Sequence, residues 1–69
     1  MKDYIKRMNK ERMELADKYE KLVKFLRTRY TILDPTELHL MREQARVMDD
    51  YIQLLDARIA HAALKEQSK

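Results

Sequence analysis

Apolar side chains recur at alternating steps of three and four residues through two long segments of the chain. This spacing places them along one face of an α-helix, as in the seam of a coiled coil. The seam positions of the first segment are Ile5, Met8, Arg12, Leu15, Tyr19, Leu22 and Leu26. Those of the second are Leu38, Met41, Ala45, Met48, Ile52, Leu55, Ile59 and Ala62. The pattern predicts two long amphipathic helices.

The boundary between the two segments carries the signals of a helix start. Asp34 can cap the second helix, Pro35 suits its first position, and Glu37 stands where a capping box places a carboxylate. The threonines and the isoleucine just upstream are poor helix formers. We therefore expect a helix over about 3–28, a turn over about 29–34, a helix over about 35–63, and a frayed tail over 64–69.

A short turn between long helices makes them antiparallel neighbours, so the expected fold is all-α, a single helical hairpin over residues 1–69. Residues whose numbers sum to roughly 63 then lie side by side, for example Ile5 with Ile59. Only Arg12, opposite Ile52, interrupts the apolar seam. Its stem can pack while its head reaches solvent or a carboxylate. Alternatively, it is a functional arginine held inside an assembly.

The second segment has more apolar surface than one seam requires. Leu40, Val47 and Leu54 lie beside the seam, and a lone hairpin would leave them in water. Contiguous exposed apolar side chains mark an interface. A chain of 69 residues also buries little core, and with no cysteine it has no disulfide to compensate. These observations predict a homo-oligomeric helical bundle, a dimer or a tetramer.

Composition narrows the class of protein further. Charged residues make up 39% of the chain and hydrophobic ones 45%, and no apolar run could span a bilayer. We expect a soluble cytoplasmic protein that has no membrane partner. We also expect no cofactor, no metal and no enzymatic activity, because the chain lacks a nucleophile with its base and a metal-ligand pattern. A helical mutase of the chorismate mutase type needs no nucleophile, but this chain lacks the third helix of that fold.

Charge is distributed unevenly along the chain. Residues 1–30 carry ten Lys and Arg against five Asp and Glu, whereas residues 31–69 carry five against seven. The basic first helix could attract an anion such as a nucleotide phosphate, or it could simply pair with the acidic second half. Nucleic-acid binding is disfavoured because acidic residues interrupt the basic ones.

Polar side chains follow one flank of the predicted hairpin. The register places Lys18 across from Gln44, Glu11 from Tyr51 and Tyr4 from Arg58, with Arg7, Glu14 and Lys21 one step further out. Lys and Arg suit phosphate, Tyr can stack on a base, and Gln can bind a base edge. The simpler interpretation is a set of salt-bridge partners along a coiled-coil flank, with Tyr51 as an interface anchor.

Two runs of residues carry a resemblance to a known family. The first is Arg7-x3-Glu11-x2-Glu14-Leu15-x2-Lys18-x2-Lys21-Leu22-x2-Phe25-Leu26. The second is Gln44-x3-Met48-x2-Tyr51-x2-Leu54-Leu55-x2-Arg58-Ile59. Over roughly residues 4 to 60, the chain resembles a family of very small bacteriophage proteins that is named after a crAss-like phage protein and consists of helical hairpins.

This resemblance implies a phage immune-evasion function in the host cytoplasm. The chain looks like an anti-CBASS sponge, a small homo-oligomer that sequesters a cyclic-nucleotide signal, such as the cyclic dinucleotide 3'3'-cGAMP, without cleaving it. The rival hypothesis is a small phage adaptor or inhibitor that binds a host protein through an exposed apolar helix face. The candidate ligand-binding residues match the family pattern and fall on the predicted flank: Arg7, Lys18, Lys21, Gln44, Tyr51 and Arg58.

Overall fold

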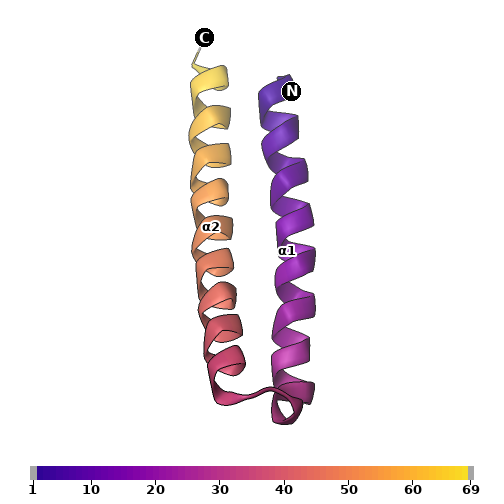
Figure 1. Ribbon diagram of the computed structural model, residues 1–69. Coiled ribbons are helices and arrows are strands. Elements are labelled where there is room, and N and C mark those ends of the chain that lie inside the picture. Colours follow the sequence, from indigo (N-terminus) through magenta and orange to yellow (C-terminus); the bar gives the residue numbers. More distant parts are fainter. Residues whose placement is uncertain (1, 69) are drawn as a thin grey trace.

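Two long helices and a single-turn connection account for the structure, a computed structural model that describes residues 2–68. Helix α1 spans Asp3–Arg29, the 3-10 helix η1 spans Tyr30–Ile32, and helix α2 spans Pro35–Gln67. The helices lie side by side and antiparallel, so that both chain ends meet at one end of the hairpin and η1 lies at the other (Figure 1). The all-α prediction is confirmed, and no strand occurs within residues 2–68.

The connection between the helices forms as its sequence predicts. The backbone N–H of Leu33 donates to the Tyr30 carbonyl at 3.2 Å, which closes η1. Asp34 is the N-cap of α2, and its Oδ1 accepts a 2.7 Å hydrogen bond from the Glu37 N–H. Pro35 occupies the first turn of α2, where backbone N–H groups have no acceptor within the helix, so its missing N–H costs no hydrogen bond.

Helix α2 extends further than the predicted end at residue 63. It continues through Gln67, so residues 64–67 are helical rather than frayed, while Lys69 lies outside the described residues. Two causes account for the difference. The segment from Ala62 onward consists of good helix formers with no glycine to end it. In addition, Glu66 accepts a 2.9 Å hydrogen bond from the Tyr4 hydroxyl, which ties this last turn to α1.

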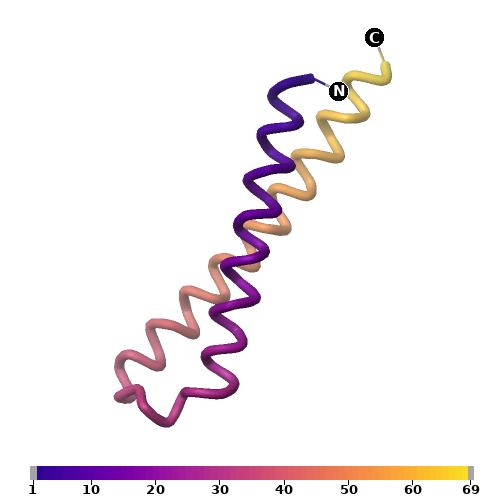
Figure 2. The backbone as a smooth tube through the Cα atoms, turned by 90° about the vertical axis from the view of Figure 1, so that its right-hand side faces the viewer, coloured from indigo at the N-terminus to yellow at the C-terminus, as the bar shows by residue number. Residues whose placement is uncertain are grey.

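The buried core occupies the half of the hairpin away from the turn. The buried side chains are Ile5, Met8, Ile52, Leu55 and Ala62. Near the turn, seam residues such as Leu22 and Met41 are only half-buried. Figure 2 shows that the two helices cross at an angle. Ile5, Met8 and Ala62 form one buried cluster, and Ile59 packs against it, partly buried.

The protomer is long and exposes much of its surface. Its extents are 53 × 14 × 13 Å, and its radius of gyration of 15.8 Å exceeds the roughly 11 Å of a spherical domain of this length. Its accessible surface of 5667 Å² exceeds by about 1,000 Å² the area that a typical monomer of 8.4 kDa exposes. Neither helix within residues 2–68 combines the length and apolar character that crossing a membrane requires.

Candidate functional site

A hollow between the helices at their free ends brings cationic and aromatic side chains together. It has a volume of about 460 Å³ and is open to solvent on one side. We call it the open-end hollow. It is lined by Tyr4, Met8, Ala57, Arg58, His61, Ala62 and Lys65.

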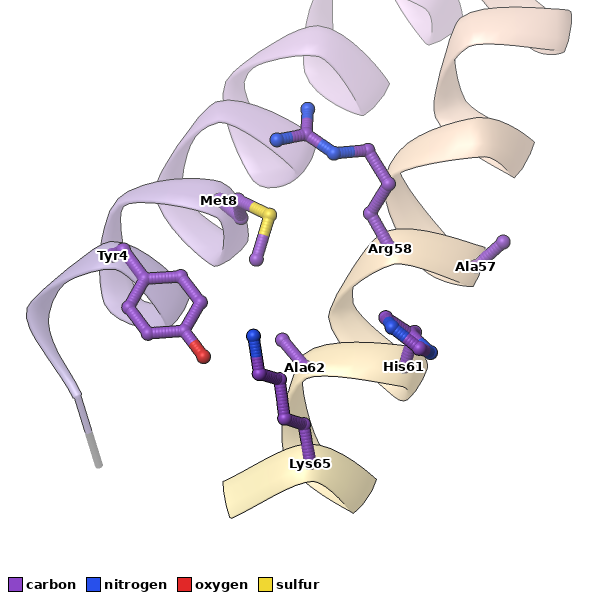
Figure 3. A pocket seen from close by; sticks show the side chains of 7 residues that line it. All are labelled: Tyr4, Met8, Ala57, Arg58, His61, Ala62 and Lys65. Carbon is purple, nitrogen blue, oxygen red and sulfur yellow. The ribbon is translucent and has the colours of Figure 1, made fainter.

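Helical spacing explains why these side chains share one site. Tyr4 and Met8 are one turn apart on α1, whereas Arg58, His61 and Lys65 follow each other on α2 at steps of three and four. Figure 3 shows the Arg58 guanidinium extending toward α1 and the Lys65 ammonium lying beside the hydroxyl end of Tyr4. The buried Met8 and Ala62 form the apolar floor. The hollow therefore offers a flat ring, an apolar base and two fixed positive charges.

The two fixed cations of the hollow are available to a ligand. Neither Arg58 nor Lys65 forms an ion pair with any of residues 2–68, whereas Arg12 and Lys21 are each held by a carboxylate. No carboxylate lines the hollow. Binding an anion there breaks no existing salt bridge, and charge-assisted hydrogen bonds to phosphate are among the stronger polar contacts.

Two tyrosine hydroxyls near the hollow are engaged by carboxylates. The Tyr4 hydroxyl donates to Glu66, and this hydrogen bond, together with desolvation and the charge of Glu66, raises the pKa of Tyr4 above its ordinary value. The Tyr51 hydroxyl donates to Glu11 and has a raised pKa for the same reasons, with Arg58 acting weakly in the opposite direction. Both rings are thereby fixed in orientation and remain neutral phenols.

One protomer does not bring the six predicted site residues together. Arg58 lines the open-end hollow, and Tyr51 lies two turns from it on the same face of α2. Gln44 is fourteen residues from Arg58, roughly 21 Å along the helix. Lys21 lines a separate hollow near the turn and pairs with Asp17 at 3.0 Å.

The remaining two predicted residues, Arg7 and Lys18, are exposed on α1 and line none of the hollows described here. A single ligand on one protomer therefore cannot contact all six.

Sequence reasoning missed three residues of the hollow. The sequence predicts Tyr4 across from Arg58 but does not single it out as a site residue; both line the hollow, and the Tyr4 hydroxyl bonds to Glu66, further along α2. Lys65 was left in a tail that is in fact helical. His61 belongs to no motif recognised in the sequence, and no group of three His, Cys, Asp or Glu within residues 2–68 could hold a metal ion. The spacing Arg58-x2-His61-x3-Lys65 would have revealed the cluster once α2 was extended.

Comparison with known proteins gives one match. A family model described as Sequestin matches residues 2–61, which is most of the chain and includes Tyr4, Arg58 and His61 of the open-end hollow. No curated protein matches the chain, and no solved structure does.

Proposed function

We propose that this chain, which belongs to the Sequestin family, captures an anionic cyclic nucleotide and holds it without cleaving it. The family name indicates a sequestering function. The ligand we propose is a cyclic dinucleotide such as 3'3'-cGAMP. The observation that carries this proposal is the open-end hollow, which unpaired Arg58 and Lys65 line together with Tyr4.

The chemistry of the hollow matches that of a nucleotide. A cyclic dinucleotide carries two phosphates and two flat bases, so it needs cations and aromatic surfaces close together. Arg58 and Lys65 supply the cations, and each contact with phosphate contributes about 1.5–3 kcal/mol, as hydrogen bonds to charged groups do. Tyr4 and Tyr51 supply rings on which a base can stack, as aromatic side chains do in single-stranded nucleic-acid sites.

The same side chains support capture without turnover. Attack on a phosphodiester needs an activated nucleophile. The hydroxyls nearest the hollow belong to Tyr4 and Tyr51, and each donates to a carboxylate that raises its pKa. Both therefore remain protonated phenols near neutral pH. We expect the ligand to be released chemically intact when the protein is denatured.

The biological setting we propose is that of a phage protein acting in the cytoplasm of an infected host. There it would lower the free concentration of a CBASS signal and so prevent activation of the host effector. Stoichiometric sequestration needs a high affinity rather than a high rate. We further propose that the working form is a homo-oligomer, because the elongated protomer leaves the apolar residues Leu40, Val47 and Leu54 exposed.

Calorimetry tests the proposed ligand class. The panel consists of cGAMP, other cyclic dinucleotides, cyclic trinucleotides and cyclic ADP-ribose isomers. We expect Arg58→Ala to weaken binding roughly 10- to 150-fold, the loss of one charged contact. Arg42→Ala is the matched control, because Arg42 is an exposed arginine of α2 outside the hollow. No heat with any member of the panel would contradict the proposal and favour the second candidate.

The second candidate function is inhibition of a host protein. It is favoured by one observation, the exposed apolar stripe on α2 that includes Leu54. An amphipathic helix commonly binds a groove on its partner through such a stripe. The two functions differ in what covers the stripe, since in the first a second copy of the chain does so.

A further inference from the structure

The outer face of α2 carries a second seam that runs the length of the helix. Leu40, Val47, Leu54 and His61 follow one another at steps of seven residues, and they alternate with Gln44, Tyr51, Arg58 and Lys65. This is the spacing with which one helix packs against another. The first half is apolar, because Leu40, Val47 and Leu54 are 60%, 55% and 57% exposed. The second half holds the cations of the open-end hollow.

We infer that a second copy of the chain packs its α2 antiparallel on this seam, with the two-fold axis at Val47, and that its turn covers the open-end hollow. The inference deepens the proposed function and rests on it only for the role of the covered hollow in nucleotide capture. A two-fold contact brings the same face of both copies together, so the seam must complement itself.

Charge disfavours the parallel arrangement. In a parallel pair each residue of the seam faces its own copy, so Arg58 would meet Arg58, Lys65 would meet Lys65, and the flanking Glu43 would meet Glu43. Like charges in contact are unfavourable. In the antiparallel pair about Val47, residues whose numbers sum to 94 lie opposite. Arg58 then faces Thr36 and Glu43 faces Tyr51, so neither meets a like charge, and Lys65 lies beyond the overlap of the two α2 helices, level with Arg29 at the end of the partner's α1.

Apolar burial selects the position of the axis. With the axis at Val47, Leu40 of each copy meets Leu54 of the other and the two Val47 side chains meet at the centre. Three apolar layers result. An axis one half-heptad further on pairs Val47 with Leu54 but leaves Leu40 against His61. That alternative gains an exposed Glu43–Arg58 pair, and exposed ion pairs contribute little compared with a buried leucine.

The same register places the turn of the second copy over the hollow. Residues 30–32 of one copy lie level with residues 62–64 of the other, beside His61 and Lys65. Two large apolar side chains of the turn, Tyr30 and Ile32, are 49% and 70% exposed in the protomer. The hollow is open to solvent on one side. The contact would bury the exposed turn and give each hollow a lid that carries a further aromatic ring.

The size of the exposed surface agrees with such a contact. The protomer exposes about 1,000 Å² more than a typical monomer of its mass. A standard stable interface buries about 800 Å² from each partner. One α2–α2 contact of this length would therefore bring the protein close to the exposure expected of its mass.

Single-cysteine crosslinking tests the inference, because the chain has no cysteine of its own. Val47→Cys lies on the axis, where closely packed helices bring their Cα atoms within disulfide range. We expect this variant to oxidise to a covalent dimer of twice 8.4 kDa. Gln53→Cys, an exposed position away from the seam, is the control and should stay monomeric on a denaturing gel.

A mixture of two variants tests the lid. Ile32→Cys and His61→Cys should crosslink when mixed and remain uncrosslinked when alone. Failure of this mixture, or crosslinking of Val47→Cys with Leu54→Cys in place of Val47→Cys with itself, would overturn the inference. Circular dichroism of each variant verifies that the helices are intact.

A crosslinked dimer that binds no nucleotide would overturn the proposed function alone, whereas a monomer that binds nucleotide would overturn this inference alone.

Discussion

Arg12 reaches from the apolar seam of α1 to Asp56 of α2, with Nε 2.8 Å from Oδ1 and Nη2 3.3 Å from Oδ2. The bidentate pair resolves the interruption that the sequence shows at this position. The arginine stem packs in the seam, half-buried, and the carboxylate at the edge receives its head. The pair also raises the pKa of Arg12, chiefly through the hydrogen bond to Asp56. Arg12 is therefore a structural residue of the hairpin.

Replacing Arg12 by leucine should not destabilise the protein. The two side chains of the pair are 38% and 53% exposed, and ion pairs of such exposure contribute little to stability. Leucine would complete the apolar seam, so we expect Arg12→Leu to melt at or above the wild-type temperature. Asp56→Asn is the matched variant that keeps the seam unchanged. A clear fall in Tm for Arg12→Leu at low salt that disappears at high salt would contradict this expectation. It would show that the ion pair contributes more to stability than an apolar side chain in the seam does.

Burial predicts that seam truncations differ in cost along the hairpin. Leu55 is 0% exposed, so Leu55→Ala should lower the free energy of unfolding by about 2–5 kcal/mol. Leu22 is half-buried in the protomer, and Leu22→Ala should cost less. Leu64→Ala, at an exposed position, is the control. Urea unfolding followed by circular dichroism measures all three, and equal losses for Leu55 and Leu22 would mean that the turn end is packed as tightly as the free ends.

A charge on the apolar stripe should dissociate the assembly. Leu54→Glu places two carboxylates beside apolar partners in the antiparallel pair, and unpaired buried charge is strongly unfavourable. We expect its sedimentation mass to fall to that of a single 8.4 kDa chain while its helix content is kept. Met13→Glu introduces the same charge at an exposed apolar residue outside the stripe and should leave the mass unchanged. Loss of mass in both variants, or in neither, would contradict the assignment of the stripe.

High pH should weaken the hairpin through Tyr51. Its hydrogen bond to Glu11 raises its pKa above the ordinary 10.0. A raised pKa in the folded state means that the contribution to stability is complete below pH 10 and is lost as the pH rises through the folded value. Tyr51→Phe should therefore show a smaller loss of stability in this range than the wild type. Thermal melts between neutral and strongly alkaline pH, with phenolate absorbance as a second readout, measure the difference.

The sequence was sufficient to predict the hairpin because local signals and periodicity agree. The alternation of three and four residues identifies both helices, and the cap of Asp34 fixes the start of α2 to the residue. The predicted pairing of Tyr51 with Glu11 is confirmed, and Ile59 packs against the cluster that contains Ile5.

The candidate site could be predicted only in part. Propensity allows α2 to continue past residue 63, but the contact that ties down its last turn, between Tyr4 and Glu66, joins residues from opposite ends of the chain and leaves no local signal. For this reason the predicted site does not include Lys65. The crossing of the helices also depends on packing along their whole length. A fixed register therefore placed Arg12 opposite Ile52, whereas its head reaches Asp56, one turn further along.

Mass spectrometry of small molecules released from the purified, heat-denatured protein tests the central claim most directly. The protein is purified from cells that produce cyclic dinucleotides, with Arg58→Ala purified in parallel. The account predicts an intact cyclic nucleotide in near-stoichiometric amount from the wild type and much less from Arg58→Ala, which removes an unpaired cation of the open-end hollow. Recovery of linear, hydrolysed nucleotide, or of no nucleotide from a wild-type protein that was exposed to the signal, would contradict sequestration.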